Sequence, residues 1–441
     1  MTPQITLRRY VEAVRSSPAL RFQGRVVQVI GLSIEVEGLA LPVGEICHIF
    51  PEGSDERISA EVVGFRGHRL VLMPYTEMQG IRPGSLVLPG GRSFKVPVGD
   101  ELLGRVVDGL ARPIDGKGPL QTQRFRASGR RPPEPLARRP IREVLTTGVR
   151  AIDALVTVGA GQRLGIFAGS GVGKSTLLGM IARHARADVN VIALVGERGR
   201  EVQEFIEQDL GADGLSRSVV VVATSDQPPL QRLKAAWVAT TMAEDFRDRG
   251  LHVILLMDSL TRFAMAQREI GLAAGEPPVA RGYPPSVNTL LPRLLERAGT
   301  AARGAITGFY TVLVEGDDMN DPVADTVRSI LDGHLWLSRE LAHENHYPAI
   351  DVLASVSRLM SRITSTEHQS LAAAAREVLA TYRRMRDLIA VGAYTPGTQP
   401  EVDRAIRTLP PLTQFLRQSP DQADSLEDTL AQLATILRST S

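Results

Sequence analysis

The chain has 441 residues, more than one hydrophobic core usually accommodates, so two or three domains are expected. Hydrophobic residues make up 43% and charged residues 23%, which indicates a soluble globular protein. The net charge of +2 is too small to indicate nucleic-acid binding by itself. The single cysteine, Cys47, excludes a disulfide within the chain. No apolar run approaches the roughly 18 residues that span a bilayer. Membrane association is therefore expected only through partners.

The N-terminal segment, residues 1–20, carries a short amphipathic pattern. Leu7, Tyr10, Val11 and Val14 fall on one face of a helix over residues 3–16. Two interpretations remain open, a frayed terminus and a helix that docks a partner. We assign residues 1–20 as a partner-binding helix and find no secretory signal pattern in them.

Residues 21–95 consist of short β-like runs separated by glycine or proline. Their regular spacing predicts a small β-barrel domain. Few aromatic residues are available to stack on bases, which weakens an RNA-binding interpretation of this barrel. The runs are RVVQVIG, SIEVEG, EICHIF, ISAEVVGFRG, RLVLMPY and SLVLPG.

Residues 96–363 alternate continuous apolar runs with helical periodicity. Continuous apolar strands are typical of a parallel sheet covered by helices on both faces, so an α/β domain is expected here. Residues 124–143 are rich in proline and arginine and predict an extended connection with a solvated charge run. Residues 364–441 predict a helical C-terminal domain. The expected strands are QRLGIFA, VNVIALVG, SVVVVAT, HVILLMD, AITGFYTVL and HLWLS, and the expected helices span 175–186, 229–249, 259–271 and 286–298.

The stretch FAGSGVGKST, residues 167–176, joins a predicted strand to a predicted helix. Glycines let such a backbone turn tightly, and its amides together with the helix N-terminus bind phosphate. Lys174 is expected to contact the β- and γ-phosphates and Ser175 to bind Mg²⁺. The strict pattern begins with glycine, whereas Ala168 stands here. The expected nucleotide-binding residues are Ala168, Gly169, Ser170, Gly171, Val172, Gly173, Lys174, Ser175 and Thr176.

Hydrolysis of a bound polyphosphate also requires a carboxylate that binds the metal, a base that orients water and positive charge for the transition state. Asp258 ends the strand HVILLMD, at the edge where parallel strands bind ligands, and is the expected Mg²⁺ carboxylate. A cap on the following helix is the alternative role. Glu197 lies just past another strand and is the expected base, with Glu201 as the runner-up. Arg198 and Arg262 follow strand ends and are expected near the γ-phosphate.

Together these segments resemble the export ATPases of type III secretion, and the flagellar members most closely. The resemblance covers residues 20–416 and is also seen to rotary ATP synthase subunits. It implies a RecA-like P-loop core, ATP as substrate and Mg²⁺ as cofactor. The segments that carry it include GERGRE, RLKAAWVATTMAEDFRDRG, MDSLTRFAMAQREIGLAAGEPP, FYTVLVEGDDMNDPVADTVRSILDGH and HYPAIDVLASVSRLMS.

The resemblance also implies a homohexameric ring whose sites lie between subunits. Arg358 matches the arginine finger supplied by the neighbouring subunit, and Tyr347 matches the aromatic that stacks on adenine. The implied partners are a regulator or stator dimer at the N-terminus, a coiled-coil stalk in the ring pore, export chaperone–substrate complexes and a membrane export gate, without nucleic acid. The implied location is the cytoplasm, at the periphery of the inner-membrane export apparatus.

Two features depart from the synthase pattern. The second adenine-contacting aromatic has no clear counterpart, because Pro420 falls near its place. The acidic loop that meets the rotor is missing, since DLIAVGAYTPGTQ stands there, which argues against a synthase subunit.

Three alternatives to a flagellar export ATPase remain open at this level. A virulence injectisome ATPase would share all of the chemistry. A non-catalytic ring subunit is disfavoured by Glu197, which such subunits typically lack. An RNA translocase is disfavoured by the aromatic-poor barrel and the small net charge.

Overall fold

The computed structural model describes residue 11 and residues 22–53, 56–314 and 321–439. These form two compact units, one within residues 1–94 together with 273–275, the other comprising residues 95–272 and 276–441. The helix expected over residues 3–16 lies outside the described residues, apart from Val11.

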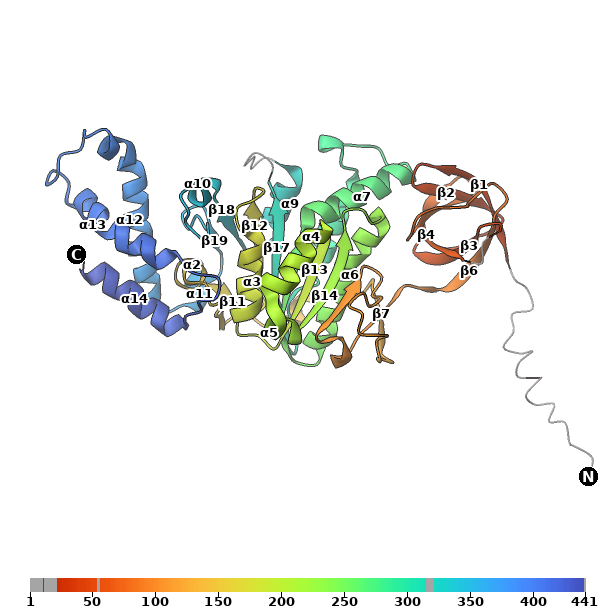
Figure 1. Cartoon of the computed structure of the whole chain (residues 1–441), viewed down its shortest axis with the longest axis horizontal. Helices are drawn as coiled ribbons and strands as arrows, with labels where there is room; N and C mark the ends of the chain where they lie inside the picture. The colour runs from red at the N-terminus through yellow and green to blue at the C-terminus, as the bar shows by residue number, and fades with distance from the viewer. Residues whose placement is uncertain (1–10, 12–21, 54–55, 315–320, 440–441) are drawn as a thin grey trace, which may run out of the picture. The chain divides into compact units, whose positions relative to one another are not determined.

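The first unit is a closed barrel of six strands in the order β1-β2-β5-β4-β3-β6 (Figure 1). Each β-like run expected from the sequence forms one strand, so the barrel prediction is confirmed. Its interior is apolar and includes Ile34, Val36, Cys47 and Leu72, each fully buried. Burial raises the pKa of the Cys47 thiol to about 12. The strands are β1 Gly24–Ile30, β2 Ser33–Glu37, β3 Glu45–Phe50, β4 Ile58–Arg66, β5 Arg69–Pro74 and β6 Leu86–Ser93.

The second unit is built around one large sheet with the strand order β19-β18-β12-β17-β15-β13-β14-β8. Strands β18 through β8 in this order run parallel, whereas β19 is antiparallel to β18. Residues 189–196 of β13 are all buried, which requires cover on both faces of the sheet. The strands are β8 Arg105–Asp108, β12 Arg163–Ala168, β13 Val189–Glu197, β14 Ser218–Thr224, β15 His252–Asp258, β17 Ala305–Leu313, β18 Gly333–Leu337 and β19 Val356–Ser357, with β16 Gly299–Thr300 beside β17.

The six strands expected for this sheet are all present, which confirms the parallel α/β core. Strand β8 was not predicted from the sequence. Its four residues carry too short a pattern to identify, and its place depends on pairing with β14, which begins 113 residues after Arg105.

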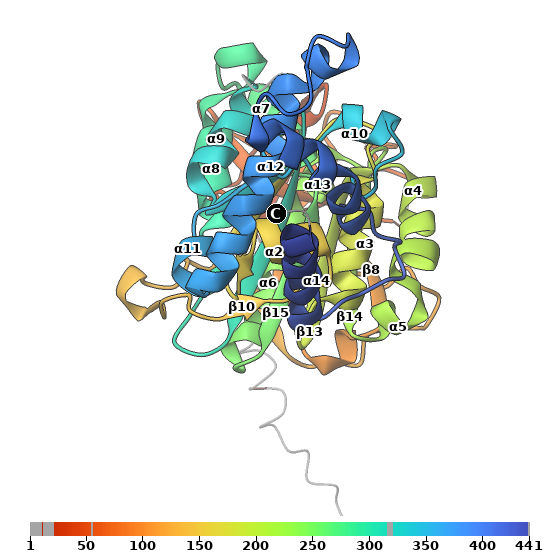
Figure 2. The same ribbon diagram turned by 90° about the vertical axis from the view of Figure 1, so that its left-hand side faces the viewer.

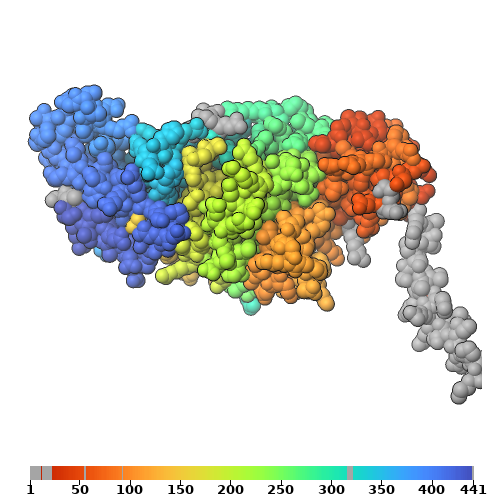
Figure 3. Space-filling view, viewed as in Figure 1, coloured from red at the N-terminus to blue at the C-terminus, as the bar shows by residue number. Residues whose placement is uncertain are grey.

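Helices cover the sheet on the face seen in Figure 1, where residues of about 170–220 fill the surface in the space-filling view of Figure 3. Helix α6 packs against β13, β14 and β15. Four expected helices are confirmed as α3 Lys174–His184, α6 Pro229–Asp248, α7 Leu260–Ala274 and α8 Pro285–Leu295. The remaining helices of the sheet region are α2 Arg150–Leu155, α4 Gly199–Glu204, the π-helix η3 Phe205–Leu210, α5 Gly211–Ser216, α9 Pro322–Ile330, α10 Arg339–His343 and α11 Met360–Ile363.

The C-terminal region is helical, as expected, and its three helices pack on one another (Figure 2). They are α12 Thr366–Ala390, α13 Pro400–Leu416 and α14 Leu426–Ser439. Helix α13 contains Pro410 and Pro411, which hid it as a separate helix in the sequence. Its buried positions Leu412 and Phe415 join the core that α3 and β12 also build.

The proline- and arginine-rich connection is extended, and most of its arginines are exposed, as expected, but several of them also pair with the sheet unit. Arg124 and Arg126 pair with the buried carboxylate of Asp245, at 2.9 and 2.8 Å. Arg138 Nη1 donates to the carbonyl of Ala298 at 2.8 Å. The arginines therefore fasten this connection to the sheet unit. Its short elements are β7 Lys95–Pro97 paired with β9 Phe125–Ala127, β10 Val144–Leu145 paired with β11 Val158–Gly159, and the 3-10 turns Asp100–Leu102 and Pro135–Ala137; a further turn spans Ala280–Gly282.

Within the described part of the chain, no helix has both the length and the apolar character needed to cross a membrane.

Candidate active site

The glycine-rich loop lies at the carboxyl end of β12 and leads directly into α3. Gly171 and Gly173 have φ of 79° and 85°, the left-handed region that side chains other than glycine rarely adopt. Gly173 is the residue before the first turn of α3, which begins at Lys174. The free amides of this turn and the helix dipole together suit an anion.

Three charged side chains meet beside this loop. Lys174 Nζ lies 2.6 Å from Asp258 Oδ1 and 3.6 Å from Glu197 Oε1. Glu197 ends β13 and Asp258 ends β15, and these two strands are neighbours in the sheet. The carboxyl ends of adjacent parallel strands bring the two carboxylates together over the loop. The side chains are 12%, 15% and 5% exposed for Lys174, Glu197 and Asp258.

The surroundings of Glu197 disfavour its charged form. Burial raises its pKa, the carboxylate of Asp258 raises it further, and Lys174 lowers it, for a result of about 7. Burial lowers the pKa of Lys174, but the two carboxylates outweigh burial and the pKa stands above its ordinary value. Glu197 Oε1 is buried and has no hydrogen-bond partner among the described residues. A carboxylate oxygen in this condition is a suitable acceptor for a water proton.

Asp258 does not cap the following helix, which was the alternative role considered for it. Its Oδ1 accepts hydrogen bonds from Lys174 and from the Thr311 hydroxyl, the latter at 2.6 Å. The amide of Arg262 instead donates to Ser259 Oγ at 3.3 Å, so Ser259 serves the first turn of α7.

Ser175 and Asp258 present the hard oxygen donors that Mg²⁺ prefers, one hydroxyl and one carboxylate. Among the described residues there is no group of three or more His, Cys, Asp or Glu side chains that could hold a metal. These donors therefore fit an ion that would take its other ligands from phosphate and water. The hydroxyl of Thr176 bonds Asp209 of η3 instead, which matches helix packing rather than metal binding.

The two arginines expected near the γ-phosphate differ in their surroundings. Arg262 lies against the end of β13, because a Cβ on Gly196 would come within 2.8 Å of Arg262 Cβ. Its Nε is buried and, within the residues that the structure describes, has no hydrogen-bond partner. Arg198 instead pairs with Glu201 at 3.0 Å, and its side chain is 80% exposed. The arrangement places Arg262 beside Glu197, while Arg198 is turned toward α4.

Tyr347 stands next to the glycine loop. A Cβ on Gly173 would lie 3.3 Å from the Tyr347 ring, which is 41% exposed. The Gln418 amide donates to the Tyr347 carbonyl at 2.9 Å, so the segment before α14 borders it. The carbonyl of Pro420 accepts hydrogen bonds from Arg183 and His184 of α3. The aromatic base of a bound nucleotide could therefore reach the Tyr347 ring on one side of the loop.

Arg358 is not brought to this cluster within one chain. It follows β19 and its amide donates to the carbonyl of Asp332, which precedes β18. Because Asp332 bonds Arg163 at the start of β12, Arg358 lies at the amino edge of the sheet. The phosphate loop begins five residues later in β12, roughly 16 Å away along the strand. The Arg358 side chain is exposed and reaches the Arg328 carbonyl at 3.4 Å.

Thr311 and Asp209 contact the site's residues but were not singled out from the sequence. Thr311 is one of two threonines in the largely apolar strand β17, so its sequence position alone did not mark it as a contact of Asp258. Asp209 carries no local signal, since it contacts Thr176 only because η3 packs against α3.

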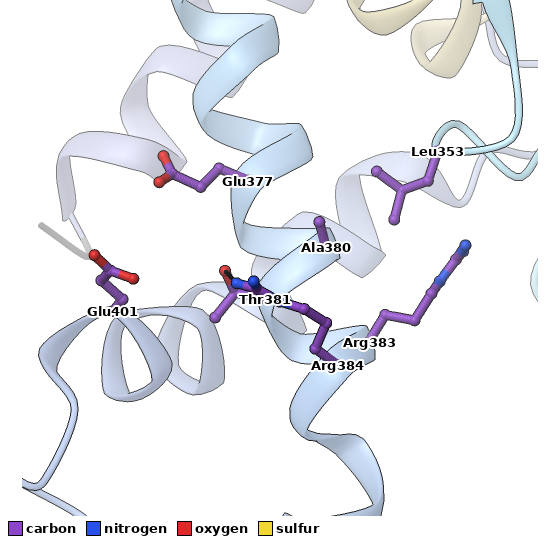
Figure 4. A pocket seen from close by; sticks show the side chains of 7 residues that line it. All are labelled: Leu353, Glu377, Ala380, Thr381, Arg383, Arg384 and Glu401. Carbon is purple, nitrogen blue, oxygen red and sulfur yellow. Dashed lines mark hydrogen bonds between the residues drawn. The ribbon is translucent and has the colours of Figure 1, made fainter.

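Two cavities lie outside this cluster. One of about 510 Å³ is lined by Leu353, by five side chains of α12 and by Glu401 of α13 (Figure 4). The other, of about 530 Å³, lies around Arg142 and His252, at the amino edge of the sheet. Neither is lined by any residue predicted for nucleotide binding.

Models of three protein domains match successive parts of the chain. Residues 26–91 match the β-barrel domain of the ATP synthase alpha/beta family, and residues 148–357 match its nucleotide-binding domain. Residues 364–435 match the C-terminal domain of the type III secretion ATPase EscN.

Relatives of two kinds align along almost the whole chain. The flagellum-specific ATP synthase of Bacillus subtilis is 54% identical over 433 residues, 97% of this chain and 98% of the relative. That of Salmonella typhimurium is 53% identical over 430 residues, 95% and 94% of the two chains. The type 3 secretion system ATPase of Xanthomonas euvesicatoria is 53% identical over 416 residues, 94% of each. The injectisome alternative is not favoured over the flagellar one.

Among solved structures, the assembled ATPase EscN of the enteropathogenic E. coli type III secretion system is 47% identical, with a TM-score of 0.90. The match covers 94% of this chain and 100% of that chain. A second structure holds EscN in complex with its central stalk EscO, at a TM-score of 0.87 and 46% identity, with the same coverage.

Proposed function

Since the chain belongs to the family of flagellar and type III secretion ATPases, we propose that it hydrolyses ATP at the cluster of Lys174, Glu197 and Asp258 and so energises export of flagellar proteins. The observation that carries this assignment is the buried trio itself, with Lys174 Nζ 2.6 Å from Asp258 and 3.6 Å from Glu197 at the mouth of the glycine loop. A non-catalytic subunit needs no such pair of carboxylates beside its phosphate loop.

Residues 168–176 bind the triphosphate through backbone amides, and Lys174 exchanges part of its contact with Asp258 for phosphate oxygens. Ser175 and Asp258 would hold Mg²⁺, which supplies positive charge to the β- and γ-phosphates when bound. Tyr347 stacks on the base. Arg262, whose buried Nε lacks a hydrogen-bond partner in the described part of the chain, would lie within reach of a phosphate bound next to Glu197.

Glu197 orients the attacking water and accepts its proton. As the water oxygen bonds to the γ-phosphorus, the bond from that phosphorus to the β,γ-bridging oxygen breaks, which yields ADP and phosphate. The pKa of Glu197 is raised to about 7. Near neutral pH a substantial fraction of Glu197 is therefore carboxylate, and this carboxylate is more basic than an ordinary one.

The transition state gains negative charge at the γ-phosphoryl group, and in the described part of the chain the cations expected near that group are Lys174, Arg262 and Arg198. Arg358 stands exposed at the opposite edge of the sheet, so it can only complete the site of another copy. A guanidinium delivered in this way neutralises charge as it forms. We infer a homohexameric ring with one site at each subunit interface, as the assembled state of EscN supports.

The same family membership supports the remaining partners. A stalk in the ring pore is proposed from the EscN–EscO complex. A regulator dimer at residues 1–20, chaperone–substrate complexes and a membrane export gate complete the proposal, with the ring in the cytoplasm at the periphery of the inner-membrane export apparatus. Hydrolysis in this ring would release chaperones and pass substrates to the gate.

The test is ATPase activity against protein concentration, with particle size measured in parallel, with and without a non-hydrolysable nucleotide. Activity per chain should rise steeply as rings form. Mixing Lys174→Ala chains with Arg358→Ala chains should restore hydrolysis, because one supplies the arginine and the other the loop. If activity per chain is independent of protein concentration and of particle size, the proposal of an active site shared between two chains is wrong.

A further inference from the structure

We propose that Gln162 and Ser357 are positioning residues that hold Arg358 in place for the active site of the neighbouring chain. The inference rests on the proposed role of Arg358 and extends it to two residues that touch neither nucleotide nor phosphate.

Gln162 lies immediately before β12 and is fully buried. Its Nε2 donates to the carbonyl of Asp332 at 3.0 Å and to the hydroxyl of Ser357 at 3.1 Å. Its Oε1 accepts a hydrogen bond from the amide of Gly159 at 2.8 Å. The side-chain amide of Gln162 therefore donates one hydrogen bond to each of the two chain segments beside Arg358.

The backbone at Arg358 is held by the same acceptor. The amide of Arg358 donates to the carbonyl of Asp332 at 3.0 Å, so this oxygen takes one hydrogen bond from Gln162 and one from Arg358. A carbonyl has two lone pairs, and both are used. The position of the Arg358 backbone is consequently defined relative to the Gln162 side chain.

Ser357 completes the attachment from the other side. Its hydroxyl donates to the carbonyl of Thr157 at 2.7 Å while it accepts from Gln162. Residues 356–357 form β19, a two-residue edge strand that pairs only with β18 among the described strands. So short an edge strand is weakly held by its ladder, and side-chain hydrogen bonds must supply the rest.

Asp332 is itself fixed to the start of β12. Its amide donates to the Arg163 carbonyl at 2.9 Å, and its Oδ2 accepts from Arg163 Nε at 3.1 Å. Gln162 and Arg163 therefore hold the segments beside Arg358, whereas the Arg358 guanidinium makes one hydrogen bond among the described residues, to the Arg328 carbonyl at 3.4 Å. The anchor is rigid and the charged end is free to enter a second chain, which is what a residue acting across an interface requires.

The experiment uses mixed rings in which each chain has one task. A Lys174→Ala chain serves only as arginine donor, and an Arg358→Ala chain serves only as site provider. Ser357→Ala is added to the donor in one preparation and to the provider in another, and steady-state hydrolysis is compared with that of the unmodified pair.

We expect Ser357→Ala on the donor to lower the restored kcat about 10- to 100-fold with little change in KM, since a misplaced group costs rate rather than ground-state binding. On the provider, which has no Arg358 to position, the same change should leave the rate within about twofold. Ser357→Thr on the donor retains the hydroxyl and should restore most of the rate. Gln162→Glu on the donor places a carboxylate oxygen against the Asp332 carbonyl and draws the Ser357 hydroxyl away from Thr157, so it should match or exceed the effect of Ser357→Ala.

An equal loss on donor and provider would indicate a general structural role and overturn the proposal, as would no loss on either. Absence of hydrolysis in the unmodified pair would overturn the shared site, and the positioning role with it. A Ser357→Ala donor that fails to enter rings is replaced by Ser357→Cys, judged by the same two criteria, with ring entry measured by light scattering.

Discussion

The two edges of the central sheet are built in different ways, although the same strands connect them. At the carboxyl edge, three largely buried charged side chains lie next to one another, those of Lys174, Glu197 and Asp258. At the amino edge, neutral hydrogen bonds from Gln162 and Ser357 hold the backbone, and the charge of Arg358 is left exposed. The first edge has most of what phosphate binding needs within one chain. The second offers a cation that its own chain cannot use.

The largest expected effect is at the amino edge. Arg358→Ala should reduce kcat by about 10³- to 10⁵-fold, because the transition-state charge loses its guanidinium. Nucleotide binding should be retained, since the loop at the carboxyl edge is untouched. The measurement is steady-state hydrolysis by assembled rings, together with nucleotide titration. Arg362→Ala, an exposed arginine on the neighbouring helix α11, is the matched control and should stay near wild type. Equal activity of the two variants would refute the assignment.

At the carboxyl edge, Glu197→Gln should reduce kcat by about 10²- to 10⁴-fold while ATP still binds, since the amide cannot accept the water proton. Glu201→Gln serves as the control and should keep most of the activity. If Glu201→Gln is instead the inactive variant, the base has been assigned to the wrong carboxylate. Single-turnover hydrolysis with bound ATP separates this loss from any change in binding.

A smaller effect, on the affinity for ATP, is expected where the adenine base is proposed to bind. Tyr347→Ala should weaken ATP binding by about 1–3 kcal/mol, the usual cost of removing an aromatic ring from a stacked base. Tyr347→Phe retains the ring and should bind like the wild type. Titration with ATP and with inorganic triphosphate provides the comparison, because only ATP has a base to lose. A similar loss with both ligands would mean that Tyr347 supports the loop through Gly173 instead.

The smallest expected effect is the pH dependence that Glu197 gives to hydrolysis at the carboxyl edge. Burial and the Asp258 carboxylate raise the pKa of Glu197 to about 7, so the carboxylate that acts as base dominates only above this value. The ratio kcat/KM should therefore fall as the pH drops through about 7, by about tenfold per unit well below it. Glu201 also raises this pKa, so Glu201→Gln should move the midpoint to lower pH. A profile that is flat between pH 5.5 and 8 in the wild type would contradict a titrating Glu197.

Much of the carboxyl edge could be predicted from the sequence because its decisive features are local. The glycines, Lys174 and Ser175 lie within one contiguous segment between an apolar strand and an amphipathic helix, and the apolar runs identify strands whose carboxyl ends must meet. Glu197 and Asp258 follow from that rule. The six barrel strands follow from glycine and proline spacing for the same reason.

Only the tertiary structure decided how distant segments align. The contact of Thr311 with Asp258, the ion pairs of Arg124 and Arg126 with Asp245, and the bond from Gln162 to Ser357 join residues that no local pattern links. Periodicity and turn chemistry act over a few residues, whereas strand order and register depend on packing of the whole sheet. The sequence by itself thus determined the phosphate loop and the elements around it. The placement of Arg358 at the far edge, out of reach of its own loop, depends on the pairing of β19 with β18 and on the hydrogen bonds of Gln162 and Ser357, which join segments far apart in the sequence.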